Sequence, residues 1–341
     1  MVRAPALQAG CRGFESLSAH HFLPVPLQIQ MAARLILNAD DFGLTHGINR
    51  AIAELHANGA VTSATLMANG PAFEDAVAIA RKRPTLGVGC HVVLTDGIPV
   101  SHPADIPSLL GSDGKTFRPS LLDFMLAVWR GQVEEDDIIR EAAAQVQRLQ
   151  RAGIDVTHLD THKHTHMLPG VARPLLFVAE RCGIGAIRNP FEEPWSLKLG
   201  PGGIVRSLQV RLLHRLRRKF YALPQIRNGA VLTTDGTLGI SATGRLNEAT
   251  LRKLVSAMPG GLWELVLHPG YNDSELEEVR TRLRETRETE RVALLSVFAD
   301  ASHNPPQPNA LELISYGKLG GPGVLRELGQ FVPNTGFERI H

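Results

Sequence analysis

The chain has 341 residues, of which 43% are hydrophobic and 21% charged, enough for one large hydrophobic core or two modest ones. Its formal net charge of +2 is too small to indicate nucleic acid as a partner. No apolar run approaches the length of a membrane span. The three cysteines, Cys11, Cys90 and Cys182, show no disulfide or metal-site spacing, so we expect a reducing, cytoplasmic compartment.

The first thirty residues show no helical or strand periodicity and lack the apolar core of a signal peptide. Met31 directly precedes the strand-like run "AARLILNADDFG". We therefore interpret residues 1–30 as a disordered extension or a start assigned too far upstream, residues 31–320 as one domain, and residues 321–341 as a C-terminal tail.

From Arg34 onward, short apolar runs that end in polar residues alternate with helical patterns, which is typical of βα units. The predicted strands are 34–41, 62–70, 86–94, 154–162, 183–190, 262–270 and, as a final candidate, 311–317. The predicted helices between them are 47–59, 72–83, 135–153, 171–183 and 247–258.

This alternation predicts an α/β fold with a parallel sheet. Polar residues follow six of the strands, which favours a barrel that gathers them at one mouth over an open doubly wound sheet. The spacing is irregular over 99–129 and 192–237. We therefore expect a single-domain, TIM-barrel-like (β/α) barrel that is distorted or incomplete.

Polar side chains at three predicted strand ends form a candidate metal site. Asp40 and Asp41 follow "LILNA", His91 follows "LGVGC" and His162 follows "VTHLDT". Adjacent carboxylates in a strand point to opposite faces unless the strand ends there, and Phe42-Gly43 indicates such an end. One aspartate and two histidines suit a catalytic divalent metal, with zinc the first choice and magnesium an alternative.

Each of these residues also has an ordinary structural explanation. His91 could be a hydrogen-bonded core histidine, and Asp40-Asp41 could form a turn or a helix cap. The histidine-rich segment 158–166 could bind metal only adventitiously at the surface. Their joint occurrence at strand ends favours the metal site.

Several motifs in a fixed order resemble the YdjC-like carbohydrate deacetylases, which include chitooligosaccharide deacetylase and a hopanoid-biosynthesis-associated deacetylase. The motifs are "LILNADDFGLTHGINRAI", "VTSATLMANGPAFEDAV", "GVGCHVVLTDG", "HLDTHKHTHMLP" and "ELVLHPGY". The resemblance implies a distorted α/β barrel that removes an N-acetyl group from a sugar with a metal ion. It also implies Asp41, His91 and His162 as metal ligands and Asp40 as catalytic base. Residues 188–225 match no fixed pattern, which leaves the substrate open.

The residues themselves suggest the same chemistry. Asp40 would take a proton from the attacking water, and His268 in "VLHPG" would protonate the leaving amine, unless it is only a turn histidine. His166, Asn69 and Arg188 are candidates for contacts with substrate or with the metal ligands. A metal-dependent phosphoesterase is an alternative, although no glycine-rich phosphate cradle is present. A non-catalytic sugar-binding protein is disfavoured because it would not need Asp40.

The segment 205–220 predicts a basic amphipathic helix, with apolar residues at helical spacing and six Arg and Lys side chains between them. Such a helix can lie on an anionic membrane, which would favour a lipid-linked acetylated amino sugar and a peripheral location at the inner membrane face. The alternative is a helix docked on the barrel with solvated arginines, and a soluble sugar as substrate. A homodimer is only the default expectation.

Overall fold

A computed structural model describes residues 33–200, 204–279, 281–299 and 311–319. The interpretations of residues 1–30 and 321–341, and Cys11, lie outside these ranges. Among the helices of the described ranges, none is both long and apolar enough to cross a membrane.

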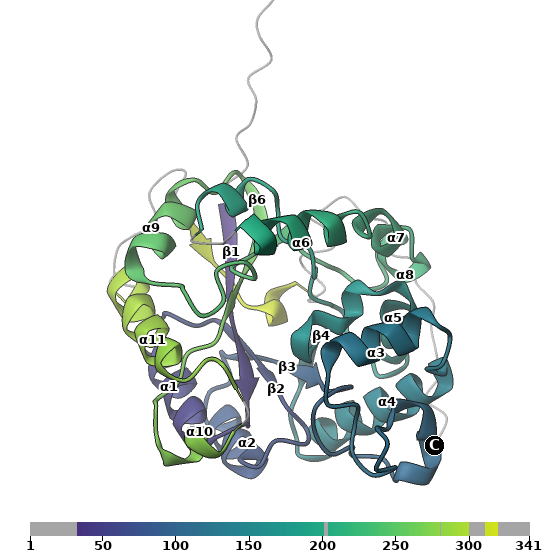
Figure 1. Cartoon of the computed structure of the whole chain (residues 1–341). Helices are drawn as coiled ribbons and strands as arrows, with labels where there is room; N and C mark the ends of the chain where they lie inside the picture. Colours follow the sequence, from purple (N-terminus) through teal and green to yellow (C-terminus); the bar gives the residue numbers. More distant parts are fainter. Residues whose placement is uncertain (1–32, 201–203, 280, 300–310, 320–341) are drawn as a thin grey trace, which may run out of the picture. The chain divides into compact units, whose positions relative to one another are not determined.

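A parallel sheet forms the centre of the described unit (Figure 1). Its strands are hydrogen-bonded in the order β4-β3-β2-β1-β6-β5, and β7 pairs with the beginning of β1. The strand bounds are β1 Ala33–Phe42, β2 Ser63–Leu66, β3 Gly87–Val92, β4 Val156–Thr161, β5 Gly236–Leu238, β6 Gly261–Leu267 and β7 Glu312–Leu313.

Helices surround the sheet. In Figure 1, α1, α10 and α11 lie beside β1, whereas α3, α4 and α5 lie beyond β3 and β4. The helix bounds are α1 His46–Ala57, α2 Phe73–Arg81, α3 Leu121–Trp129, α4 Glu135–Arg151, α5 Pro169–Arg181, α6 Ile204–His214, α7 Arg217–Tyr221, α8 Pro224–Arg227, α9 Glu248–Ser256, α10 Ser274–Glu278 and α11 Glu285–Phe298. The five predicted helices correspond to α1, α2, α4, α5 and α9.

An irregular segment joins the two edges of the sheet. Ile187 bridges to Leu159 of the edge strand β4, and Glu192 bridges to Thr237 of the opposite edge strand β5. Because one short stretch touches both edges, the sheet curves toward closure, which confirms the predicted distorted barrel. The strand predicted at 183–190 forms only isolated bridges, since its pairings with Leu159 and with Leu232 each extend over a single residue.

Two further elements differ from prediction. The three-residue strand β5 was not predicted, because so short a run carries no readable alternation. The helix predicted at 205–220 is divided into α6 and α7. Its Leu208 and Leu212 side chains are 67% and 58% exposed, whereas Phe220 is buried. The α6 part therefore leaves Leu208 and Leu212 largely in solvent, whereas its Leu213 is partly buried.

Helix α4 packs against the sheet and also fixes the loop after β3. Its apolar residues at helical spacing, such as Ile138 and Val146, are buried. On the same helix, Gln145 bonds both backbone groups of Val93, and Glu141 accepts from the amide of Val100. These bonds satisfy backbone groups that no strand pairs, and they hold the chain next to His91 in one conformation.

Candidate metal centre and catalytic residues

The two adjacent aspartates reach the same side of the sheet through a bulge in β1, rather than through an early strand end. Strand β1 continues to Phe42, which pairs with Leu66, and the register shifts between Ala39 and Phe42. Asp41 lies within this bulge with φ of 64°, a left-handed conformation that aspartate tolerates better than most residues. The bulge therefore removes the alternation that would have separated the two carboxylates.

Asp41, His91 and His162 converge as the sequence predicts. Asp41 Oδ1 lies 3.6 Å from His91 Nε2 and 3.5 Å from His162 Nδ1, and the two ring nitrogens are 3.3 Å apart. A tetrahedral ion with bonds of about 2.1 Å has ligands roughly 3.4 Å apart. The three residues are therefore positioned to hold a metal ion. The His162 side chain is 22% exposed, so the triangle formed by Asp41, His91 and His162 is accessible to solvent at His162.

The carboxylate of Asp160 orients His91. His91 Nδ1 donates to Asp160 Oδ1 at 2.7 Å, which directs Nε2 at the other two ligands. Burial lowers the pKa of His91, but the carboxylates of Asp160, Asp40 and Asp41, Asp160 foremost, together outweigh burial and raise that pKa to about 9. A carboxylate behind a ligating histidine is the usual support of a metal site. Asp160 lies two residues after His158 on the same strand, so period-two alternation is the signal that would have placed it inside the barrel.

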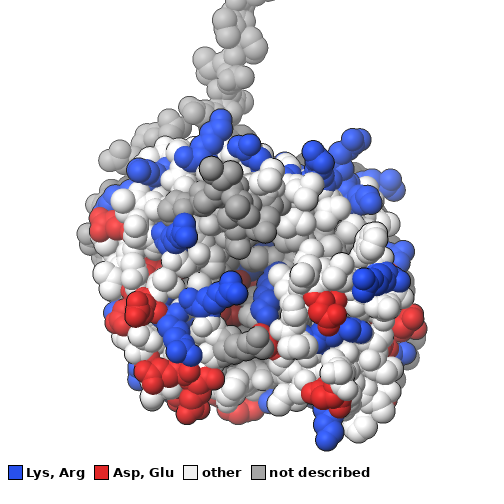
Figure 2. Space-filling model, in the orientation of Figure 1, with Lys and Arg blue, Asp and Glu red and all other residues white. Residues whose placement is uncertain are grey.

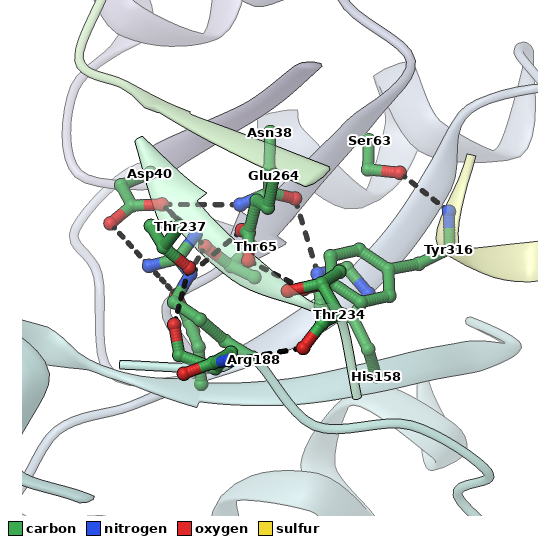
Figure 3. Close-up of polar contacts among 12 residues, drawn as sticks. Asn38, Asp40, Ser63, Thr65, His158, Arg188, Thr234, Thr237, Glu264 and Tyr316 are labelled. Carbon is green, nitrogen blue, oxygen red and sulfur yellow. Dashed lines mark hydrogen bonds and ion pairs between the residues drawn. The ribbon is translucent and has the colours of Figure 1, made fainter. Parts of the chain in front are cut away.

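A second acidic cluster, Asp40 with His91 and Asp160, is already occupied by a guanidinium. Arg188 donates to both oxygens of Asp40 at 2.6 and 2.8 Å (Figure 3). It also pairs with Asp160. Because Arg188 neutralises these carboxylates, this cluster is a poor metal site. Burial raises the pKa of Asp40, yet Arg188 holds that pKa well below its usual range, so Asp40 is ionised at neutral pH.

Behind this pair lies a fully buried polar layer. Arg188 Nε donates to Glu264, and the Tyr316 hydroxyl donates to the other oxygen of Glu264 at 2.5 Å. The Tyr316 ring stacks on His158, whose Nε2 bonds Asn38 (Figure 3). Burial raises the pKa of Glu264 to about 7 against the opposing charge of Arg188. Sequence reasoning missed Glu264, although one carboxylate inside an apolar strand signals a buried partner.

His268 lies beside Asp40, after β6. Its Nε2 is 3.8 Å from Asp40 Oδ2, and its Nδ1 has no partner among the described residues. Burial lowers the pKa of His268 to about 4, so the ring is neutral at physiological pH. The predicted base and the predicted acid are therefore neighbours.

The remaining candidates lie elsewhere. Both ring nitrogens of His166 contact protein groups, Thr161 Oγ1 and the carbonyl of Arg188, which leaves neither nitrogen for a sugar. Asn69 donates to the carbonyl of Ile98 in a loop. The guanidinium of Arg188 is fully buried and pairs with Asp40, Asp160 and Glu264. Of the three, Arg188 directly supports the predicted base.

Helix α11 contributes two charged groups that sequence reasoning missed. The segment "RETRETERVALLS" carries charges at helical spacing, which predicts a mainly solvated helix face. That prediction is wrong for Arg287 and Glu290, which are 1% and 2% exposed. Arg287 Nη2 donates to Asp41 Oδ2 at 2.5 Å, and Glu290 accepts from the His268 amide at 2.6 Å. Helical charge spacing alone cannot tell such buried groups from solvated ones.

Replacing Glu290 by Gln should make the protein less sensitive to rising pH. Burial raises the pKa of Glu290 to about 8, so the folded state binds a proton that the unfolded state releases above its own lower pKa. Wild type should therefore lose on the order of 2 kcal/mol relative to Glu290→Gln between pH 5 and 7.5. Urea denaturation at several pH values measures this difference. Glu288→Gln, at a side chain 46% exposed on the same helix, is the control; parallel curves for wild type and Glu290→Gln would contradict the assignment.

Known proteins resemble the chain in sequence and in fold. A carbohydrate deacetylase of Brevibacillus brevis is 44% identical over 48% of this chain and 60% of its own length. A chitooligosaccharide deacetylase of Salmonella heidelberg is 42% identical over 43% of this chain and 56% of its own length. The chain thus spans less than two thirds of either relative.

A crystal structure from Enterococcus faecalis V583, named only provisionally as a cellobiose-phosphate cleavage protein, has the same fold. It superposes with a TM-score of 0.65 at 23% identity over 85% of this chain and all of its own. The family model described as YdjC-like protein matches residues 34–301, which include every residue of the metal triangle. On that match, the chain belongs to the family of YdjC-like proteins.

Proposed function

We propose that the protein is a metal-dependent hydrolase that removes the N-acetyl group of an amino sugar. The observation that carries the proposal is the Asp41, His91 and His162 triangle, with Asp40 and His268 side by side next to it. The names of the two relatives, carbohydrate deacetylase and chitooligosaccharide deacetylase, support the same reaction.

Asp41, His91 and His162 would hold the ion, and their spacing favours a tetrahedral centre such as zinc, with one position left for water or substrate. A bound divalent ion supplies a Lewis acid that acidifies water and polarises the acetamide carbonyl. The rest of the chemistry falls to the side chains around it.

Asp40 is the general base in this scheme. Arg188 donates to both oxygens of Asp40, and Asn38 and Thr65 also donate to Oδ1. The carboxylate is therefore held in one orientation and is ionised. It accepts a proton from the attacking water. His268 is neutral beforehand, and its Nε2 lies 3.8 Å from Asp40 Oδ2. It would take over the proton that Asp40 has accepted and deliver it to the leaving amine. Acetate and a free amine result.

Asp40→Asn should lower acetate release from N-acetylglucosamine-containing substrates by about a hundredfold or more, because it removes the base. Metal content should stay near that of wild type, since Asp40 is outside the triangle. His162→Ala should lose the metal and serves as the contrasting variant. An acetate assay with elemental analysis tests both; equal release by wild type and Asp40→Asn would rule out the assigned base.

His268→Ala should lower kcat at least tenfold while leaving the bound metal in place, since general acid catalysis contributes at this scale. His46→Ala, at an exposed histidine on α1, controls for loss of an imidazole. Turnover and metal content are measured together. Loss of metal with His268→Ala would show that the residue supports the site rather than the leaving group.

A mostly apolar pocket, lined in part by the residues that follow His162 in the chain, supports a lipid-linked substrate over a free oligosaccharide. The pocket has a volume of about 560 Å³ and begins at Lys163 and His164, directly after the ligand His162. Its wall includes Met125, Met167, Leu168, Phe191, Leu212 and Leu213. An apolar group attached to the amino sugar would be desolvated there, whereas a second sugar would leave its hydroxyls facing methyl groups.

Exposed apolar side chains near this pocket support contact with a membrane surface. Leu122 and Leu212 line the pocket and are 65% and 58% exposed, and Trp129 on α3 is 82% exposed. Exposed basic residues of α6, of α7 and of the turn between them accompany these side chains: Arg211, Arg215, Arg218 and Lys219. Lys and Arg side chains line the upper edge of Figure 2, the edge that α6 and α7 occupy in Figure 1. Basic and apolar groups together suit an anionic bilayer.

Leu208→Glu should weaken binding to vesicles of equal phosphatidylglycerol and phosphatidylcholine by about tenfold, because one leucine no longer leaves water and a negative charge is added. Val292→Glu, at an apolar residue 53% exposed on α11, is the matched control. Co-sedimentation gives both affinities. Absence of wild-type binding, or equal binding by Leu208→Glu, would instead favour a soluble oligosaccharide.

A further inference from the structure

The two oxygens of Asp41 have different partners. Oδ1 faces His91 Nε2 and His162 Nδ1, whereas Oδ2 accepts from Arg287 Nη2 at 2.5 Å. The carboxylate is 5% exposed and the guanidinium 1%, so water does not compete effectively for this contact. One oxygen is therefore directed at the metal position, and the other is engaged by a cation from α11.

Arg287 is itself held in place by the loop after β6. Its Nη1 lies 3.5 Å from the carbonyl of His268, and its own carbonyl accepts from the amide of Gly270 at 3.3 Å. A Cβ added at Gly270 would lie 3.1 Å from Arg287 Cδ, which is tighter than almost all such contacts. Glycine at this position thus lets the loop close over the arginine stem.

We propose that Arg287 is a positioning residue that commits Asp41 to bind the metal through Oδ1 alone. A carboxylate can coordinate a divalent ion through one oxygen or through both, and the second oxygen takes a position that a catalytic site must keep for water or substrate. Because the guanidinium occupies Oδ2, this position stays open. The inference rests on the proposed metal-dependent function and extends it to a helix outside the sheet.

The bulge in β1 is the reason that such a device is needed. Asp41 has a left-handed backbone conformation, which costs free energy and leaves the carboxylate direction dependent on its contacts. The ion pair with Arg287 opposes a rotation of the carboxylate that would bring Oδ2 toward His91 and His162. A merely structural arginine would hold α11 against the sheet without influencing how Asp41 binds a metal.

The test uses the full-length protein loaded with Co²⁺ and the variant Arg287→Met, which keeps an unbranched side chain without the charge. We expect Arg287→Met to retain one cobalt per chain, to show an altered visible absorption spectrum, and to bind acetate at the cobalt at least tenfold more weakly, because Asp41 Oδ2 takes the open position. In the deacetylase assay its kcat should fall at least tenfold with little change in KM.

Arg284→Met, at an exposed arginine one turn earlier, is the control and should match wild type in every measurement. Arg287→Lys keeps a charge with a single donor group, so it should restore part of the spectrum and of acetate binding; it also serves if Arg287→Met does not fold.

A folded Arg287→Met with the wild-type cobalt spectrum and acetate affinity would overturn the proposal. Loss of cobalt from a folded Arg287→Met would overturn it as well, since Arg287 would then be required for metal binding itself. If wild type releases no acetate from any amino sugar, the proposed function fails, whereas the cobalt spectra still report on Arg287.

Discussion

The buried guanidinium of Arg188 connects three strands in the interior of this barrel. Arg188 lies between Asp40, Asp160 and Glu264, three carboxylates that come from three different strands and have almost no access to water. Each carboxylate would be strongly unfavourable there alone, and removal of one partner of a buried ion pair typically costs about 3–5 kcal/mol. Arg188 therefore allows three strands to carry Asp40, Asp160 and Glu264 into the interior, as Arg287 does for Asp41.

The consequences extend from Arg188 in two directions. On one side, Glu264 connects Arg188 to the hydroxyl of Tyr316, whose ring stacks on His158. Toward the mouth, Asp40 is kept ionised, and Asp160 orients His91 for a metal. The bulge in β1 then gives two adjacent aspartates separate tasks, since Asp40 faces a cation of the protein and Asp41 faces the two histidines.

Much of the fold was predictable because its signals are local. Alternating apolar runs and helical patterns identified all five strands of the described residues that are longer than three residues. The polar residues that follow these strands pointed to Asp41, His91 and His162, which lie close together in the structure. The three-residue β5 and the closing segment around Ile187 and Glu192 were not recognisable, because isolated bridges leave no periodic pattern. The buried charges of α11 were missed because a charged helix face looks the same whether water or a carboxylate covers it.

The sequence by itself determined which residue types stand at the ends of the strands, because parallel strands bring their carboxyl ends to one edge whatever the detailed geometry. Only the tertiary structure decided what each of them contacts. Arg188, a candidate for contact with substrate or with the metal ligands, is fully buried and pairs with Asp40 and Asp160. Arg287, on a helix face expected in solvent, contacts Asp41. The partner of a charged side chain is set by elements far away in the chain, here by β1 for a residue of α11. Local sequence patterns therefore cannot predict that ion pair.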